Sequence, residues 1–253
     1  MDPFTKISRS ELFFLADSHF RDRRIPEEAV RRRYFIEFFS RVPDDSAVLL
    51  LGDIFDFYFE YATVVSKRYF DIFHGLHKAS ARGVEIHFLG GNHDYWFDGF
   101  LREDIGVTPH GDDLLFECQG RKLWCTHGDL FMPGDGNYKT IRSIIRNRLV
   151  IAAAKFLHPD LMDAIAARVS KGSKNRNKRS VKDMANQLAA RPDHEFFSKG
   201  NDVFVMGHVH YPIHKTRDGR DFMIVGDWIE NFSYGRMREG RLSLERFKLE
   251  GTD

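Results

Sequence analysis

Five short polar clusters along the chain carry residue types that bind divalent metal ions. They are Asp17-Ser18-His19, Gly52-Asp53, Gly91-Asn92-His93-Asp94, His127-Gly128-Asp129 and Gly207-His208-Val209-His210. Residues two apart on an extended chain face the same side, so Asp17 and His19 can converge on one point. The same spacing brings together His208 and His210. Carboxylate, amide and imidazole groups without a thiolate suit ions such as Mn²⁺, Fe²⁺ or Zn²⁺, so the clusters predict a metal site.

A carboxylate can bridge two ions, and Asp53 is the natural candidate for that role. Two ions about 3.5–4 Å apart produce a nucleophile from water and clamp phosphoryl oxygens, which is the chemistry of phosphoester hydrolysis. Any one cluster alone could be an ordinary surface turn. Five of them in this order, each closing a predicted strand, favour the metal site over surface turns.

Each polar cluster follows a short apolar run of the strand type. These runs are Leu12–Ala16, Ala47–Leu51, Glu85–Leu89, Lys122–Thr126 and Asp202–Met206. Runs of this length and composition predict buried strands, and the carboxyl ends of parallel strands meet at one edge of a sheet. Apolar residues at helical intervals predict helices from Pro26 to Ser40 and from Val64 to Ser80. The alternation predicts an α/β fold, with short antiparallel strands after Gly219.

The segment from Lys139 to Lys182 differs from the rest of the chain in charge. It carries twelve basic residues against two acidic ones, Asp160 and Asp163. Apolar residues such as Ile141 and Ile144 recur in it at helical spacing. We predict a basic, helical cap over residues 135–182, inserted in a single domain that spans residues 1–253. A solvated helix face or a nucleic-acid patch are the alternatives to a lipid-binding or membrane-binding cap.

Bulk properties place few limits on partners but favour one compartment. The chain has 253 residues and a formal net charge of +1. Its two cysteines, Cys118 and Cys125, do not make a disulfide framework, which favours a reducing compartment. We expect no signal peptide and no membrane-spanning run. The expectation is a cytoplasmic protein that can still bind a membrane surface.

The order of the five clusters resembles the calcineurin-like metallophosphoesterase superfamily, from residue 12 to about residue 230. The resemblance implies a four-layer α/β/β/α sandwich of two mixed sheets. It implies one metal held by Asp17, His19, Asp53 and His210. It implies a second metal held by Asp53, Asn92, His127 and His208. Two divalent ions, with Mn²⁺ favoured, are the expected cofactors.

His93 and Asp53 are the catalytic residues that the resemblance implies. His93 would lie on the leaving-group side of the phosphate, where a histidine donates a proton or stabilises developing charge. The alternative is that His93 only orients Asp94 or its loop. A non-catalytic scaffold of the same fold would be expected to have lost metal ligands, and here all seven positions are filled.

Within that superfamily the chain is most similar to the UDP-2,3-diacylglucosamine hydrolases. Phe55-Asp56 follows the Gly-Asp cluster, and two further residues, Asp135 and Tyr138, stand eight and eleven positions after His127. The substrate-binding residues implied are Asn92, His93, Asp135, Tyr138, Ser173, Asn177 and His208. Better-known members have arginine at the position of His93. They also have lysine at the position of Ser180, where Lys178 or Arg179 could substitute.

The reaction implied is hydrolysis of the pyrophosphate bond of UDP-2,3-diacylglucosamine to lipid X and UMP, in lipid A biosynthesis. The alternative is a phosphatase or phosphodiesterase of the same superfamily that acts on another phosphoester. The expected partners are an acylated sugar nucleotide and the cytoplasmic face of the inner membrane, bound peripherally. No nucleic acid is expected, and the oligomeric state is left open.

Overall fold

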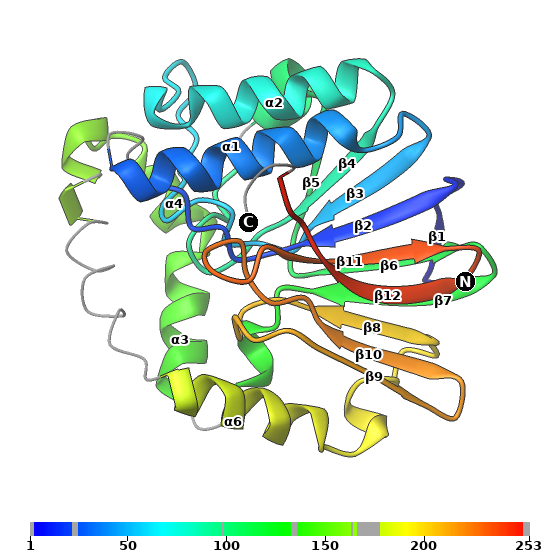
Figure 1. The fold of residues 1–253 in the computed structure, drawn as a ribbon. Coiled ribbons are helices and arrows are strands. Elements are labelled where there is room, and N and C mark those ends of the chain that lie inside the picture. Colours follow the sequence, from blue (N-terminus) through cyan, green and yellow to red (C-terminus); the bar gives the residue numbers. More distant parts are fainter. Residues whose placement is uncertain are drawn as a thin grey trace.

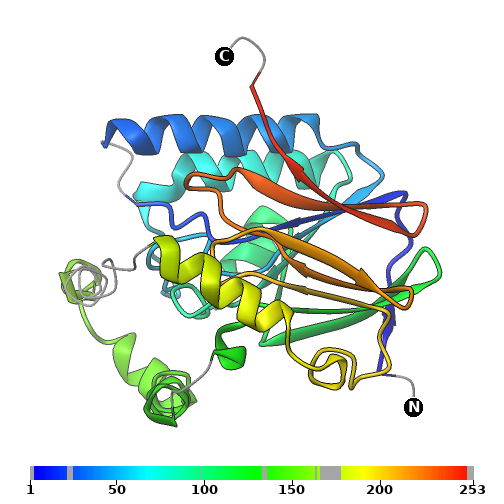
Figure 2. The ribbon, with the colours of Figure 1, turned by 60° about the horizontal axis from the view of Figure 1, so that its bottom comes forward.

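Two six-stranded mixed sheets lie face to face between layers of helices (Figure 1, Figure 2). The computed structural model describes residues 3–21, 25–97, 99–132, 136–162, 164–165 and 178–249. Helices α1 (Pro26–Arg41) and α2 (Phe70–Ala81) cover the first sheet, and α6 (Lys178–Ala189) covers the second. This is the four-layer α/β/β/α sandwich that the resemblance implied.

The first sheet has the strand order β12-β11-β2-β3-β4-β5. Its strands are β2 (Glu11–Leu15), β3 (Ser46–Leu50), β4 (Glu85–Leu89), β5 (Val107–His110), β11 (Ser233–Arg238) and β12 (Arg241–Arg246). Strands β2 to β5 are parallel, whereas β11 is antiparallel to both of its neighbours. The helix after β2, α1, begins with Pro26 in its first turn and ends with Arg41, both of which suit those helix ends.

The second sheet has the order β1-β6-β7-β8-β10-β9. Its strands are β1 (Thr5–Lys6), β6 (Asp113–Cys118), β7 (Arg121–Thr126), β8 (Val203–Met206), β9 (Ile213–Arg217) and β10 (Arg220–Ile224). Antiparallel pairing was expected after Gly219. It holds for β11 with β12 and for β10 with β9, but β10 is parallel to β8. The expectation was therefore only partly right, because the chain crosses from β8 to the edge and returns beside it.

The central strands are buried on both faces. In β2, Leu12 and Phe14 face the second sheet, while Phe13 and Leu15 face the helices. A strand between two apolar layers must be apolar at nearly every position, which is why these strands read as continuous apolar runs. Burying each such side chain stabilises the fold by about 1.5–3 kcal/mol. The loops after these strands are thus attached to the buried core of the molecule.

Helices lie between β7 and β8, in the stretch where the basic cap was predicted over residues 135–182, and this stretch is called the insertion below. In the described part of the chain they include α3 (Gly136–Ile145), α4 (Arg148–Ala154) and α6, which extends beyond residue 182, and they are preceded by the 3₁₀ turn η3 (Asp129–Phe131). The other short helical turns are η1 (Lys67–Tyr69), the π-helix η2 (Leu101–Ile105) and η4 (Asp193–Glu195). Among the residues that the structure describes, none of the helices is long and apolar enough to cross a bilayer.

Candidate metal centre

Five loops at one edge of the sheets carry the predicted metal ligands. Each loop follows the carboxyl end of one of the parallel strands β2, β3, β4, β7 and β8. Because parallel strands end at the same edge, residues far apart in the sequence meet there. The structure brings together all seven predicted ligands, which are Asp17, His19, Asp53, Asn92, His127, His208 and His210.

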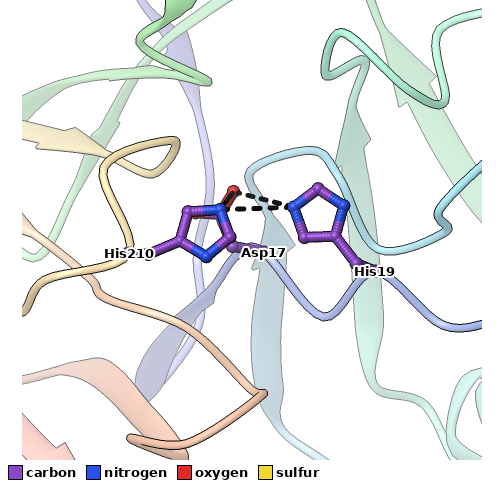
Figure 3. A group of neighbouring side chains, drawn as sticks. All are labelled: Asp17, His19 and His210. Atoms are coloured by element: carbon purple, nitrogen blue, oxygen red, sulfur yellow. Dashed lines mark hydrogen bonds and ion pairs between the residues drawn. The ribbon is translucent and has the colours of Figure 1, made fainter. Parts of the chain in front are cut away.

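Asp17, His19 and His210 form the first group of candidate ligands (Figure 3). The Nε2 atoms of His19 and His210 lie 3.3 Å apart. The Oδ1 atom of Asp17 lies 3.8 Å from Nε2 of His19 and 3.5 Å from Nε2 of His210. Three donor atoms from two different loops therefore face one point, as the ligands of a single ion would.

Asp53 lies between the first group and a second one. Its Oδ2 atom is 3.6 Å from Nε2 of His19, 3.5 Å from Nε2 of His127 and 4.0 Å from Nε2 of His93. A carboxylate that faces imidazoles on both sides is placed where it could bridge two ions. The bridging role itself stays a prediction.

The second group consists of Asp53, His127 and His208, with Asn92 beside them. Nε2 of His127 lies 3.1 Å from Nδ1 of His208 and 3.1 Å from Oδ1 of Asn92. The other ring nitrogen of His127, Nδ1, donates to the carbonyl oxygen of Leu51 at 2.8 Å. That bond directs Nε2 into the group, as is usual for a histidine that binds metal.

The backbone at five candidate ligands adopts the left-handed conformation that side chains other than glycine rarely take. The φ angles lie between 43° and 68° at Asp17, His19, Asp53, His208 and His210. Each such residue costs of order 1–3 kcal/mol, and such residues cluster at functional sites. The fold holds these loops in place against that cost, which directs the side chains to one centre.

Two glycines permit the loops to approach each other closely. A Cβ atom on Gly52 would lie 2.6 Å from Cα of Gly91 and 2.8 Å from Nδ1 of His127. A Cβ atom on Gly207 would lie 2.6 Å from Cβ of Ala16 and 2.9 Å from Oδ2 of Asp17. Glycine is required at both positions because any side chain would push the ligand loops apart.

Two further aspartates contact the ligand loops without belonging to the predicted ligand set. Asp94 is fully buried and accepts hydrogen bonds from the backbone amides of Asp53, Ile54, Phe55 and Gly91. Asp227 lies 3.8 Å from Nδ1 of His210 and was not identified from the sequence. It follows β10 as Gly226-Asp227, the same signal that identified Asp53, so the pattern could have found it.

Burial and mutual attraction set the pKa values in this centre. Burial raises the pKa of Asp17 well above its usual range, and burial lowers that of His19 well below its own. Burial also acts to raise the pKa of Asp53, but the surrounding histidines outweigh it and hold that pKa well below the usual value. Burial acts to lower the pKa of His127, yet Asp53 raises it to about 10. If His127 binds a metal ion as predicted, the binding would therefore release a proton.

The residues present fit divalent metal ions. The donor atoms are carboxylate and amide oxygens and imidazole nitrogens, a set that suits Mn²⁺, Fe²⁺ or Zn²⁺. The Oδ1 atom of Asp17 is buried and has no hydrogen-bond partner in the described part of the chain. A buried carboxylate oxygen without a partner is costly, and a bound cation would satisfy it.

His93 lies beside both Asp53 and His19, two of the predicted metal ligands. Its Nδ1 atom donates to the carbonyl oxygen of Asp56 at 2.8 Å, and its backbone amide donates to Oδ1 of Asp53 at 2.9 Å. Its ring stands edge-on to that of His19, with centroids 4.9 Å apart. The Nε2 atom therefore faces the centre. Its proposed catalytic role stays a prediction.

Of the four substrate-binding residues predicted in the insertion, the structure describes only Tyr138. Asp135, Ser173 and Asn177 lie outside the described residues. Tyr138 lies on α3, and its hydroxyl donates to Oδ2 of Asp129 at 2.7 Å. Lys178 and Arg179, either of which could substitute for the family lysine absent at Ser180, lie at the start of α6.

Comparison with known proteins agrees with this geometry. A model of the calcineurin-like phosphoesterase family matches residues 11–212, a span that includes all five loops. A UDP-2,3-diacylglucosamine hydrolase of Porphyromonas gingivalis is 27% identical over 89% of this chain and 93% of its own. Proteins of the same name are 25% identical in Xanthomonas campestris, over 93% and 98%, and 24% identical in Haemophilus ducreyi, over 85% and 91%. The chain belongs to the calcineurin-like phosphoesterase family, and it is a hydrolase.

Proposed function

We propose that the protein hydrolyses the pyrophosphate bond of UDP-2,3-diacylglucosamine to lipid X and UMP, a step of lipid A biosynthesis. The observation that carries the proposal is the length of the match to hydrolases of that name. The Xanthomonas campestris protein covers 93% of this chain, which is too much to leave the insertion outside the match. The alignment therefore spans the part that would select the substrate as well as the metal edge.

The surface of the insertion supports an acylated substrate. We define the apolar face of the insertion by its exposed residues Ile141, Ile144, Leu149, Val150, Phe156 and Leu157. Phe156 is 91% exposed, and Ile141 and Ile144 are each 56% exposed. Exposed apolar patches of this kind mark ligand or membrane contacts. Helix α3, which carries part of this face, contacts the loops of the metal edge through Arg142 and through the backbone carbonyl of Ile145.

In the proposed mechanism two groups of side chains hold two ions. Asp17, His19 and His210 would hold the first ion, and Asn92, His127 and His208 the second, with Asp53 shared. When bound, the ions would supply a nucleophile from water and neutralise charge on the phosphoryl oxygens. The amide of Asn92 and the ring of His208 would also orient a phosphate oxygen.

His93 would act on the leaving group. The hydrogen bond from Nδ1 to Asp56 fixes the ring, so that Nε2 points into the centre. In its protonated form the ring would donate a hydrogen bond or a proton to the oxygen that leaves phosphorus. This role would take the place of the arginine found in the better-known hydrolases.

We also propose that the protein binds Mn²⁺ and associates peripherally with the cytoplasmic face of the inner membrane. The exposed side chains of Lys139 and Arg148 lie on α3 and α4, the helices that carry most of the apolar face. Basic residues near anionic headgroups contribute about 1 kcal/mol each, and the apolar face would add burial in the acyl region.

The test is hydrolysis of the acylated sugar nucleotide itself. Purified protein with Mn²⁺ is incubated with UDP-2,3-diacylglucosamine in detergent micelles, and the products are followed by ³¹P nuclear magnetic resonance. We expect UMP and a lipid monophosphate, with no reaction in the presence of a chelator. Hydrolysis of a small aryl phosphodiester without hydrolysis of the acylated sugar nucleotide would instead favour another phosphoester as substrate.

A further inference from the structure

Helix α3 turns its polar side, and not its apolar side, towards the loops of the metal edge. We infer that Arg142 and Arg146 on that side are positioning residues for Asn92 and His127, the ligands predicted for the second metal. The inference rests on the ligand assignment of the proposed function. It gives the insertion a role in metal binding in addition to any role in covering the substrate.

Arg146 holds the loop that carries Asn92. Its Nη2 atom donates to the carbonyl oxygen of Gly91 at 2.7 Å, one residue before Asn92. Its guanidinium also stacks over the ring of Tyr95, with 4.3 Å between the charge centre and the ring centroid. On the other side of Asn92, the amide of His93 donates to Asp53. Arg146 therefore attaches the loop to α3 at Gly91 and at Tyr95, which stand on either side of Asn92.

Arg142 holds the loop that carries His127. Its Nε atom donates to Oδ2 of Asp129 at 2.6 Å, and Asp129 is almost completely buried. The hydroxyl of Tyr138, one turn earlier on α3, donates to the same oxygen at 2.7 Å. Asp129 stands two residues after His127, so these bonds fix the end of its loop. A buried carboxylate with two donors from one helix ties that helix firmly to the loop.

Asp112 joins the two arginines. Arg142 donates to both of its carboxylate oxygens, at 2.6 and 3.2 Å, and Arg146 donates to one of them. The arginines are four residues apart, so they lie on one face of α3. Two guanidinium groups face the carboxylates of Asp112 and Asp129, which balances the charge. Because the set is shared, α3 can leave one loop only by disturbing its contacts with the other.

The first group of candidate ligands is held by a different helix. Arg31 of α1 donates to the carbonyl oxygens of Ser18 and His19, the latter at 3.2 Å. His210 has Asp227 at 3.8 Å, from the loop after β10. The two groups therefore have separate supports. The inference predicts that changes on α3 weaken the second metal site and spare the first.

The test measures metal binding and not turnover. Metal-free Arg146→Ala is titrated with Mn²⁺ by calorimetry, beside the wild type and Arg236→Ala. Arg236 is a matched control, because it donates two bonds of 2.9 Å to Glu11 at the start of β2, the end opposite the metal edge. We expect Arg146→Ala to lose about 10–100-fold in affinity at one site, with the other site and the control within about twofold of the wild type.

Electron paramagnetic resonance then separates positioning from a general loss of structure. With two equivalents of Mn²⁺ the wild type should show a coupled pair of ions, and Arg146→Ala the spectrum of isolated Mn²⁺. Arg146→Lys should recover only part of the affinity, because an ammonium group lacks the planar fork that reaches Gly91 and Asp112 together. If Arg146→Ala does not fold, Asp112→Asn must show the same loss at one site.

Equal weakening of both metal sites would overturn the inference. Wild-type affinity at both sites in Arg146→Ala and in Asp112→Asn would also overturn it. So would a wild-type protein that binds a single Mn²⁺. A wild type that binds two Mn²⁺, shows the one-site loss and yet does not hydrolyse UDP-2,3-diacylglucosamine would overturn the proposed substrate only, and the inference would stand.

Discussion

The metal edge buries polar side chains, whereas helices α3 and α4 expose apolar ones. Both arrangements are the reverse of the usual pattern of burial. The metal edge buries carboxylates and imidazoles, among them Asp17 with no exposed surface. Helices α3 and α4 leave isoleucine, leucine and valine in solvent, and Phe156 follows directly after them. Folding alone gains nothing from either arrangement, because buried charge and exposed apolar surface both cost free energy. Each region therefore indicates a ligand of its own character, a cation in one case and an apolar group in the other.

Helix α6 supplies the reference for this comparison. It belongs to the same insertion as α3 and is also amphipathic, but it packs Ala185 and Leu188 against the second sheet. Leu188 is 1% exposed, against 56% for Ile144 on α3. Two helices with the same type of sequence pattern thus serve different purposes. One covers the sheet, and the other keeps its apolar side free.

The largest effect should come from the shared carboxylate of the metal edge. Asp53→Asn keeps the shape of the side chain but removes the charge that faces both groups of ligands. We expect kcat/KM on a phosphodiester to fall on the order of 10³-fold or more, which is about 4 kcal/mol of barrier. Asp221→Asn is the control, because that aspartate is also buried but bonds Arg121, His214 and Thr216 away from the metal edge. Activity of Asp53→Asn within tenfold of the wild type would remove Asp53 from the ligand list.

A smaller effect, on the free energy of unfolding, should distinguish the buried apolar side of α6 from the exposed apolar side of α3. Leu188→Ala should lower the free energy of unfolding by about 2–5 kcal/mol, because it leaves a cavity under α6. Ile144→Ala should change it by no more than about 0.5 kcal/mol, because the side chain is in solvent. Urea denaturation of the metal-free proteins measures both. Equal destabilisation by the two changes would mean that α3 packs its apolar face against the protein in solution.

The smallest effect concerns the charge buried at Asp17. Burial raises the pKa of this carboxyl, so its contribution to stability is greatest below the unfolded value of about 3.9 and is lost as the pH rises through the folded pKa. Asp17→Asn removes that loss and suits the left-handed backbone at φ 54°. At pH 7 the metal-free variant should therefore be more stable than the wild type by about 1 kcal/mol.

Addition of Mn²⁺ should make the wild type more stable than Asp17→Asn. The wild type should gain more stability from the metal, because the charged oxygen then has its partner. Thermal unfolding with and without Mn²⁺ measures this. A metal-free Asp17→Asn protein that unfolds below the wild type would show that the buried carboxylate is not a cost to the fold.

The elements predicted correctly from the sequence are those with a clear apolar run or with apolar residues at helical spacing. The five strands that end in polar clusters and the helix from Pro26 lie within one or two residues of the expected bounds. β9 was not expected, because it is an edge strand whose IHKTR sequence has no apolar alternation. β6 alternates between buried and partly exposed residues from Leu114 to Cys118, so a search for period two could have found it.

The orientation of α3 could not be predicted from its own sequence. Helical spacing of Ile141 and Ile144 predicts an amphipathic helix, and an amphipathic helix ordinarily buries its apolar side. Here the opposite side is buried, because Arg142 meets Asp129 and Asp112, which lie 13 and 30 residues before it. Contacts at that distance follow from the tertiary fold and leave no trace in a local pattern. The metal loops were easier to predict, since each ligand cluster directly follows its strand.

The central claim is that the free apolar face of the insertion receives the acyl chains of the substrate. The most direct measurement compares kcat/KM for UDP-2,3-diacylglucosamine with that for a small aryl phosphodiester in the double variant Ile141→Gln, Ile144→Gln. Val30→Gln is the control, because Val30 is equally exposed but lies on α1. We predict that the ratio of the two kcat/KM values falls at least about tenfold in the double variant, from lost apolar contact, and is unchanged in the control. A ratio equal to that of the wild type would contradict the account.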